Sequence, residues 1–245
     1  MRPLASTPAL LLLALLAAPP AGATGCPEPT GASPSLRRVE AEARLSFIQE
    51  RLRHDAARAH VWTGAWTGGY ALMSVGQLAV TPFLSPADRV DFYVGAASTV
   101  GAAAAVLAVP LDVMTDSPAL DARIGSKAGP DTCAVLAEAE RLLAKDAANE
   151  ADSAGWMMQA ANLSYNLAIG LVLGLVFKHW ESGAINAGAG WLIGEAMILT
   201  QPTHLVDDLR RYREGQLEPE RTPVSFQIGP SLGSRGFGLS LTLSF

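Results

Sequence analysis

Two pairs of apolar segments, one a diverged copy of the other, constrain the fold of this chain more than any other feature. The first pair runs from about residue 62 to 111, and the second from about 156 to 201. Repetition of this kind indicates one supersecondary unit that is used twice. The marks shared by the two copies are Gly95-Ala96 with Gly101, and Gly188-Ala189 with Gly194.

A charged stretch precedes each apolar pair and belongs to the repeat. Asp55-Ala56-Ala57 in the first copy is matched by Asp146-Ala147-Ala148 in the second. In residues 36–59 the apolar side chains recur at helical spacing, and no breaker separates them from the uncharged run 61–80, which ends before Pro82. We therefore expect one long helix with a polar first half and an apolar second half.

Each apolar run has about the ~20 residues that a helix needs to cross a bilayer. The glycines at 95, 101, 188 and 194 are expected to let helices pack closely, as small residues do in membranes. The flanking charges oppose simple insertion, because Arg51, Arg53 and Arg58 would lie on the exported side. The same four runs are therefore also compatible with an exported helical bundle that never spans a membrane.

The N-terminus predicts export. Arg2 is followed by an apolar stretch, and Ala21-Gly22-Ala23 fits a small-residue cleavage site, so residues 1–23 are expected to be a signal peptide. Lipidation at Cys26 is a less favoured alternative, because Ala23 stands where a larger aliphatic residue is usual. Arginine outnumbers lysine strongly among the 18 basic residues, and Ala and Gly are abundant, which favours a bacterial source.

The chain has two cysteines, Cys26 and Cys133. In an exported protein the simplest prediction is one disulfide between them, which would tie the mature N-terminus to the segment between the repeats. The alternatives are two free thiols, or a lipidated Cys26 with a lone Cys133. No Cys/His cluster with metal-ligand spacing is present, so the sequence predicts neither a zinc site nor a cofactor.

The C-terminus has a different pattern. Apolar and polar residues alternate at 224–228 and again from Phe237 to Phe245, which predicts a β-hairpin with one apolar face. The last strand resembles the C-terminal strand of bacterial outer-membrane barrels, which has alternating apolar residues and a terminal aromatic residue. One hairpin leaves its edges unpaired, so it would need a partner surface.

Four polar residues within the apolar runs are the candidates for a site: Glu195, Asn162, Asn166 and Gln77. An ionisable group inside a membrane helix is a functional candidate, and the amides would line a cavity or channel. The less specific interpretation is hydrogen bonding between helices, which sets their register, and we prefer it. No serine, cysteine or carboxylate pair stands in a recognisable catalytic arrangement, so we expect no enzyme.

Taken together, the sequence predicts a mainly α fold in which two repeated helical hairpins form a four-helix unit, followed by a short β-hairpin. We expect a non-enzymatic, membrane-associated protein of the bacterial cell envelope with a structural, assembly or pore-like role. The alternative is an exported soluble bundle that binds a lipid or another apolar ligand. The expected partners are membrane lipid and either further copies of the chain or another envelope protein; the net charge of -5 argues against nucleic acid.

The expected organisation has seven segments. They are a signal peptide (1–23), a flexible lead-in (24–35), the first hairpin repeat (36–111), a connector (112–134), the second hairpin repeat (135–201), a polar linker (202–223) and the C-terminal β-hairpin (224–245).

Overall fold

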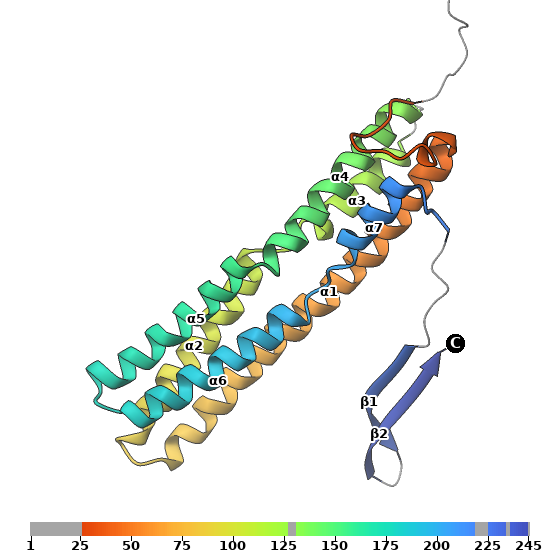
Figure 1. The fold of residues 1–245 in the computed structure, drawn as a ribbon. Helices are drawn as coiled ribbons and strands as arrows, with labels where there is room; N and C mark the ends of the chain where they lie inside the picture. The colour runs from red at the N-terminus through yellow and green to blue at the C-terminus, as the bar shows by residue number, and fades with distance from the viewer. Residues whose placement is uncertain (1–25, 127–130, 219–224, 234–235, 245) are drawn as a thin grey trace, which may run out of the picture.

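The computed structural model describes residues 26–126, 131–218, 225–233 and 236–244, with side chains for the first two ranges. The expected signal peptide and its cleavage site lie outside these residues. The fold is mainly helical, as predicted, and its helices run along a shared direction in one elongated bundle (Figure 1). The helices are α1 (Ala41–Val80), α2 (Asp88–Ala108), α3 (Val113–Ile124), α4 (Thr132–Ser153), α5 (Trp156–Leu171), α6 (Trp180–Leu199) and α7 (His204–Glu214).

The predicted long helix is confirmed by α1, whose 40 residues span about 60 Å at 1.5 Å per residue. It ends in the short 3-10 turn η2 (Thr81–Phe83), where Pro82 fits the start of a turn. A 3-10 turn η1 (Leu36–Arg38) precedes α1, and a π-helical segment η3 (Val172–Val176) closes α5. Because no break divides α1, its polar and apolar halves form one continuous rod.

The other helices break where α1 does not, and this divides the bundle into two halves. Pro110 follows the end of α2, Gly155 separates α4 from α5, and Pro202 separates α6 from α7. The first half of α1 packs with α3, α4 and α7, and we call this the polar half. The second half of α1 forms a hairpin with α2, and α5 forms one with α6; these four we call the apolar half.

The contiguous buried core of the described residues lies in the polar half. It includes Ile48 and Leu52 of α1, Leu136 and Leu143 of α4, and Leu205 of α7, each with no more than 1% of its surface exposed. These residues recur every three or four positions, so each helix buries one face and leaves the charged face in water. The polar half is therefore packed like a water-soluble four-helix bundle.

The connector and the polar linker contain more structure than the sequence indicated. Residues 113–124 form α3, which buries Val113 and Leu120 in the core, although Pro118 lies inside it. Residues 204–214 form α7, which ends at Gly215 in the left-handed conformation (φ +76°) that glycine adopts readily. The sequence predicted only a connector and a polar linker here, because proline, glycine and charge mask a short apolar stripe, and tertiary packing overrides such weak propensities.

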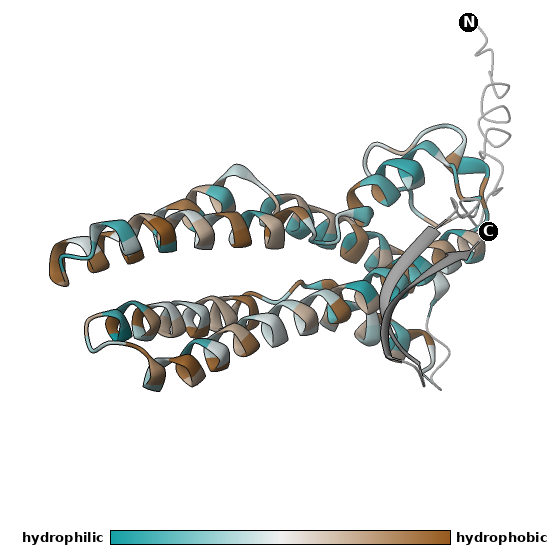
Figure 2. Cartoon of the chain, turned by 90° about the horizontal axis from the view of Figure 1, so that it is seen from below, coloured by the Kyte–Doolittle hydropathy of each residue, from teal (hydrophilic) through white to brown (hydrophobic). Residues whose placement is uncertain are grey.

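The apolar half is packed quite differently. Of the described residues, every large apolar side chain that is exposed, except Val206, lies between Val61 and Leu199. Figure 2 shows the two hairpins of this half as separate arms that extend from the polar half. The segments Asp88–Ile124 and Thr132–Val176 each hold an 18-residue helical stretch apolar enough, by length and composition, to cross a membrane.

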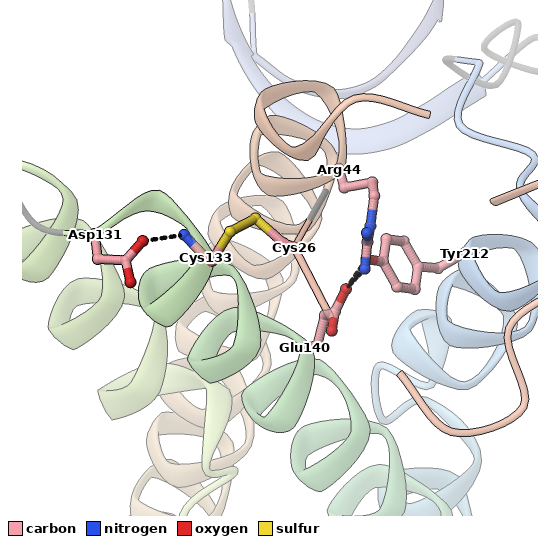
Figure 3. The surroundings of a disulfide bond; sticks show 6 residues. All are labelled: Cys26, Arg44, Asp131, Cys133, Glu140 and Tyr212. Atoms are coloured by element: carbon pink, nitrogen blue, oxygen red, sulfur yellow. Dashed lines mark hydrogen bonds and ion pairs between the residues drawn. A yellow bond between two sulfur atoms is a disulfide. The ribbon is translucent and has the colours of Figure 1, made fainter. Parts of the chain in front are cut away.

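The disulfide between Cys26 and Cys133 is present and joins the start of the described chain to the first turn of α4 (Figure 3). The Asp131 carboxylate accepts a hydrogen bond from the Cys133 amide at 3.0 Å and so caps α4 beside the disulfide. Nearby, Arg44 of α1 and Tyr212 of α7 both bind the Glu140 carboxylate of α4. This end of the polar half is therefore held by a covalent bond and a buried ion pair.

The backbones of β1 (Ser225–Gly233) and β2 (Gly236–Ser244) pair in antiparallel register, from Ser225 opposite Ser244 to Gly233 opposite Gly236. Their side chains lie outside the described residues. The one-sided apolar hairpin therefore stays a prediction, and the packed part of the protein consists of helices.

Candidate functional site

Buried carboxyl groups form a layer in the polar half, just before the apolar half begins. Asp55 of α1 and Asp146 and Glu150 of α4 are each no more than 2% exposed. Asp55 and Asp146 are the equivalent aspartates of the two repeats, so each copy contributes one buried carboxyl at the same level. Burying an unpaired carboxylate is costly, so these groups must be neutralised, paired or hydrogen-bonded.

Glu150 is paired with Asp55. Burial, together with a hydrogen bond to the Asp55 carboxyl, raises the pKa of Glu150 to about 10. At neutral pH Glu150 therefore keeps its proton and donates it to Asp55, whose oxygens accept no other hydrogen bond from the described residues. Its second oxygen accepts a hydrogen bond from the Leu205 amide at 3.0 Å, in the first turn of α7. Glu150 of α4 is thus joined to α1 by its proton and to α7 by its second oxygen.

Asp146 is also paired with a carboxyl group, that of Asp116 in the short helix α3. Burial, with a hydrogen bond to the Asp116 carboxyl of α3, raises the pKa of Asp146 to about 8. The Lys145 ammonium lies 2.7 Å from Asp116 and 3.1 Å from Asp112. Asp146 of α4 is thus joined directly to α3, whereas Asp55 of α1 reaches α7 only through Glu150 of α4.

Among the described residues, the carboxyl oxygens of Asp112, Asp116 and Asp146 lie within 4.8 Å of one another, a spacing that could hold a metal ion. The Lys145 ammonium already lies against two of the three carboxylates and supplies the positive charge. Lys145 therefore already supplies part of the positive charge that a metal ion would bring to these carboxyls.

These buried carboxyl groups were not among the predicted site residues, although two of them belong to the repeated motif. Asp55-Ala56-Ala57 and Asp146-Ala147-Ala148 served only as marks of duplication. An aspartate followed by alanines, on the apolar face of a helix that leads into an uncharged run, is a sign of a buried carboxyl group. Glu150 lies four residues after Asp146 and so shares its face. What the pattern does not reveal is the partner of each carboxyl.

The structure brings three of the four predicted polar residues together in the apolar half. The Asn162 amide donates to Glu195 Oε1 at 3.0 Å and to the Trp191 carbonyl at 3.1 Å, which ties α5 to α6. The Asn166 amide donates to the carbonyl and the side-chain oxygen of Asn162, both at 2.8 Å. Gln77 lies elsewhere, on α1, and donates to the Met73 carbonyl.

The glycines explain how these amides fit. Asn162 lies over Gly194, so closely that a Cβ atom there would collide with the amide. Gly95 makes room in the same way for Gln77, and Gly101 for the Tyr165 hydroxyl. Gly188 makes no such contact within the chain, because a methyl group at that position would meet open space.

The two copies of the motif differ at this position. Gly188 is the repeat equivalent of Gly95, but the two copies do not face equivalent neighbours. Gly190, which is not part of the repeated motif, makes the close contact that was expected of Gly188. The Asn166 amide lies against it.

A groove of about 240 Å³ lies between the two hairpins of the apolar half. Its wall includes Tyr70 of α1, Ala102 of α2, Ala161 and Asn166 of α5, and Ile198 of α6. We call it the interhairpin groove. The Tyr165 hydroxyl donates to the Ser98 carbonyl at 2.8 Å and joins α5 to α2 beside it. None of the described residues that line it carries a charge.

Comparison of the chain with protein-family models, with curated proteins and with solved structures found no match. The function must therefore be argued from the two halves of the bundle and from the groove.

Proposed function

We propose that this is an exported, non-enzymatic protein of the bacterial cell envelope whose apolar half lies in a membrane and whose polar half projects from it on the exported side. The observation that carries the proposal is the distribution of exposed apolar side chains. They cover both hairpins of the apolar half and, apart from Val206, are lacking from the described polar half. A soluble protein rarely exposes such a continuous apolar surface, which in water favours aggregation.

Exposed aromatic side chains support this placement. Trp156 is 75% exposed where the apolar half begins, and Trp180 is 56% exposed near its far end. Phe83 is 88% exposed in the turn that follows α1. Tryptophan is enriched at both interfaces of a membrane, because its ring is apolar while its N–H group favours water. The two tryptophans are separated by the apolar length of α5 and its π-helical extension.

The polar half supports an exported location. It also reduces the conflict with the tendency of membrane proteins to keep Lys and Arg on the cytoplasmic side. A disulfide persists in oxidising compartments outside the cytoplasm. Arg53 pairs with Asp121 at 2.7 Å, and Arg51 lies 3.6 Å from Asp208. Two of the three arginines that would flank the first crossing on the exported side are thus paired with acidic side chains of the polar half.

A wash of isolated membranes at alkaline pH with carbonate tests this proposal. We expect the full chain to stay in the pellet and to enter solution only with detergent, because its apolar surface is covered by lipid. Release of the native chain into the carbonate supernatant would contradict membrane insertion. That outcome would favour the second candidate, an exported bundle that binds an apolar ligand in the interhairpin groove.

A further inference from the structure

We infer that the interhairpin groove binds one acyl chain of a bilayer lipid, which enters sideways between α2 and α5. The inference rests on the proposed membrane insertion of the apolar half. Membrane insertion alone requires only that lipid covers the outer surface of the apolar half. The inference adds a specific lipid-binding site between the two hairpins.

The groove has a closed floor and an open side. Tyr70 and Ile198, on the floor, are 5% and 2% exposed. On the other side Ala105 of α2 and Ala161 of α5 are exposed, and Tyr165 is 40% exposed. The small side chains at this rim leave an entrance between α2 and α5. In a membrane this entrance faces lipid.

The chemistry of the wall selects an apolar occupant. The donors of its polar side chains are used within the protein: the Asn166 amide on Asn162, the Tyr165 hydroxyl on Ser98, and the Thr99 hydroxyl on Ala96 at 2.9 Å. A charged or strongly polar ligand would therefore find neither a counter-charge nor a free donor. Apolar cavities of this kind stay dry and take up apolar molecules.

Size and position favour an acyl chain. A volume of about 240 Å³ has room for about eight groups of water or methylene size, taking roughly 30 Å³ for each. The groove lies in the part of the apolar half that adjoins the polar half, within the last turns of α2 and the first turns of α5. In the proposed orientation this is the exported leaflet, whose chains are present at very high local concentration.

Photolabelling of the purified full chain in phosphatidylcholine vesicles tests the inference. A small fraction of the lipid carries a diazirine in the middle of one acyl chain, and labelled residues are identified by mass spectrometry after illumination. We expect labels on the groove floor, at Tyr70 and Ile198. We also expect labels on the outward-facing Leu107 and Leu163, which contact bulk lipid. Labelled outward residues with an unlabelled floor would overturn the inference while membrane insertion stands.

A variant whose groove entrance is blocked provides a second test. The double substitution Ala105→Leu with Ala161→Leu narrows the entrance, and we expect it to abolish floor labelling while Leu107 and Leu163 stay labelled. The matched control is Ala104→Leu with Ala160→Leu, at neighbouring exposed positions outside the groove wall, and it should keep both sets of labels. Floor labels that persist in the blocked variant would refute entry between α2 and α5. Loss of outward labels in the wild-type protein would instead refute membrane insertion.

Discussion

Single carboxyl groups carry the most sensitive interactions of the polar half. Glu150 and Asp146 are held protonated by burial and by carboxyl partners, and they join α4 to α1 and to α3, respectively. A proton shared between two buried carboxyls removes one charge from the interior, and its loss leaves two like charges in contact. The layer is therefore most stable at low pH and loses stability progressively as the pH rises from about 4 to about 10.

The pH dependence of stability follows with a definite sign. Glu150 has an ordinary pKa of 4.5 when unfolded and about 10 when folded, and for Asp146 the values are 3.8 and about 8. Unfolding releases these protons, so the free energy of unfolding falls as pH rises through the two windows, by about 1.4 kcal/mol per pH unit for each group. Between about pH 8 and 10, the part of the decline that Glu150 and Asp146 cause comes from Glu150 alone.

The variants Glu150→Gln and Asp146→Asn test this, with chemical denaturation followed by circular dichroism in detergent at a series of pH values. We expect Glu150→Gln to flatten the decline up to about pH 10, and Asp146→Asn to flatten it only below about pH 8. Glu42→Gln, an exposed site on the same α1 rod, should leave the profile unchanged. A wild-type stability that rises with pH over this range would contradict the shared protons.

At the scale of elements, close approach between helices depends on glycines that lie under polar side chains. Gly194 of α6 accommodates Asn162 of α5, whose amide then bonds to Trp191 and Glu195. Helix pairing in the apolar half thus combines a small residue with an interhelical hydrogen bond, as membrane helices do.

Gly194→Ala should weaken the α5–α6 hairpin. The added Cβ displaces the Asn162 amide and breaks its bonds to α6, which we expect to cost about 1–3 kcal/mol. Gly188→Ala is the matched control on the same helix, because its Cβ meets open space. It should be neutral or stabilising by up to about 1 kcal/mol, since alanine favours the helix. Thermal unfolding in detergent measures both, and equal effects would refute the packing role of Gly194.

The disulfide acts on elements as well, because it closes a loop with a sequence separation of 107 residues. Loop closure of this length restricts the unfolded chain, and its removal should cost roughly 4–5 kcal/mol. We expect Cys26 and Cys133 to resist alkylation until reductant is added, and Cys133→Ser to unfold at lower denaturant concentration. Ready alkylation without reductant would show that the bond does not form in the cell.

At the scale of the whole molecule, one bundle carries two opposite surface patterns. The polar half buries its leucines and exposes charge, whereas the apolar half exposes its large side chains and buries amides and small residues. The continuous α1 carries both patterns without a break. The turn between η2 and α2 and the C-terminal end of α3 consequently lie at opposite ends of the bundle (Figure 1); Ala87 belongs to the first, and Ser126 follows the second.

This polarity predicts opposite accessibility for two added cysteines. With the native disulfide intact, Ser126→Cys should react with a membrane-impermeant maleimide applied from the exported side. Ala87→Cys should react only after the membrane is breached, because the apolar half separates the two positions. Both positions are exposed in the fold, so the comparison reports the membrane rather than burial. Equal labelling of the two in intact membranes would contradict a crossing by the apolar half.

The sequence by itself determined the helical class, the uninterrupted α1 and the disulfide pair. Helical periodicity, the lack of a breaker before Pro82 and a count of two cysteines are local or compositional facts, and they need no knowledge of neighbours. The repeat also located Asp55 and Asp146, although only as equivalent positions.

Only the tertiary structure decided which faces meet. It paired Asp55 with Glu150 and Asp146 with Asp116, formed α3 and α7 from segments with weak helical signals, and left Gly188 facing outward. A repeat motif encodes equivalent positions, but the partners of those positions come from other parts of the chain. The energy of a buried carboxyl or of a glycine contact depends on that partner, which local periodicity does not record.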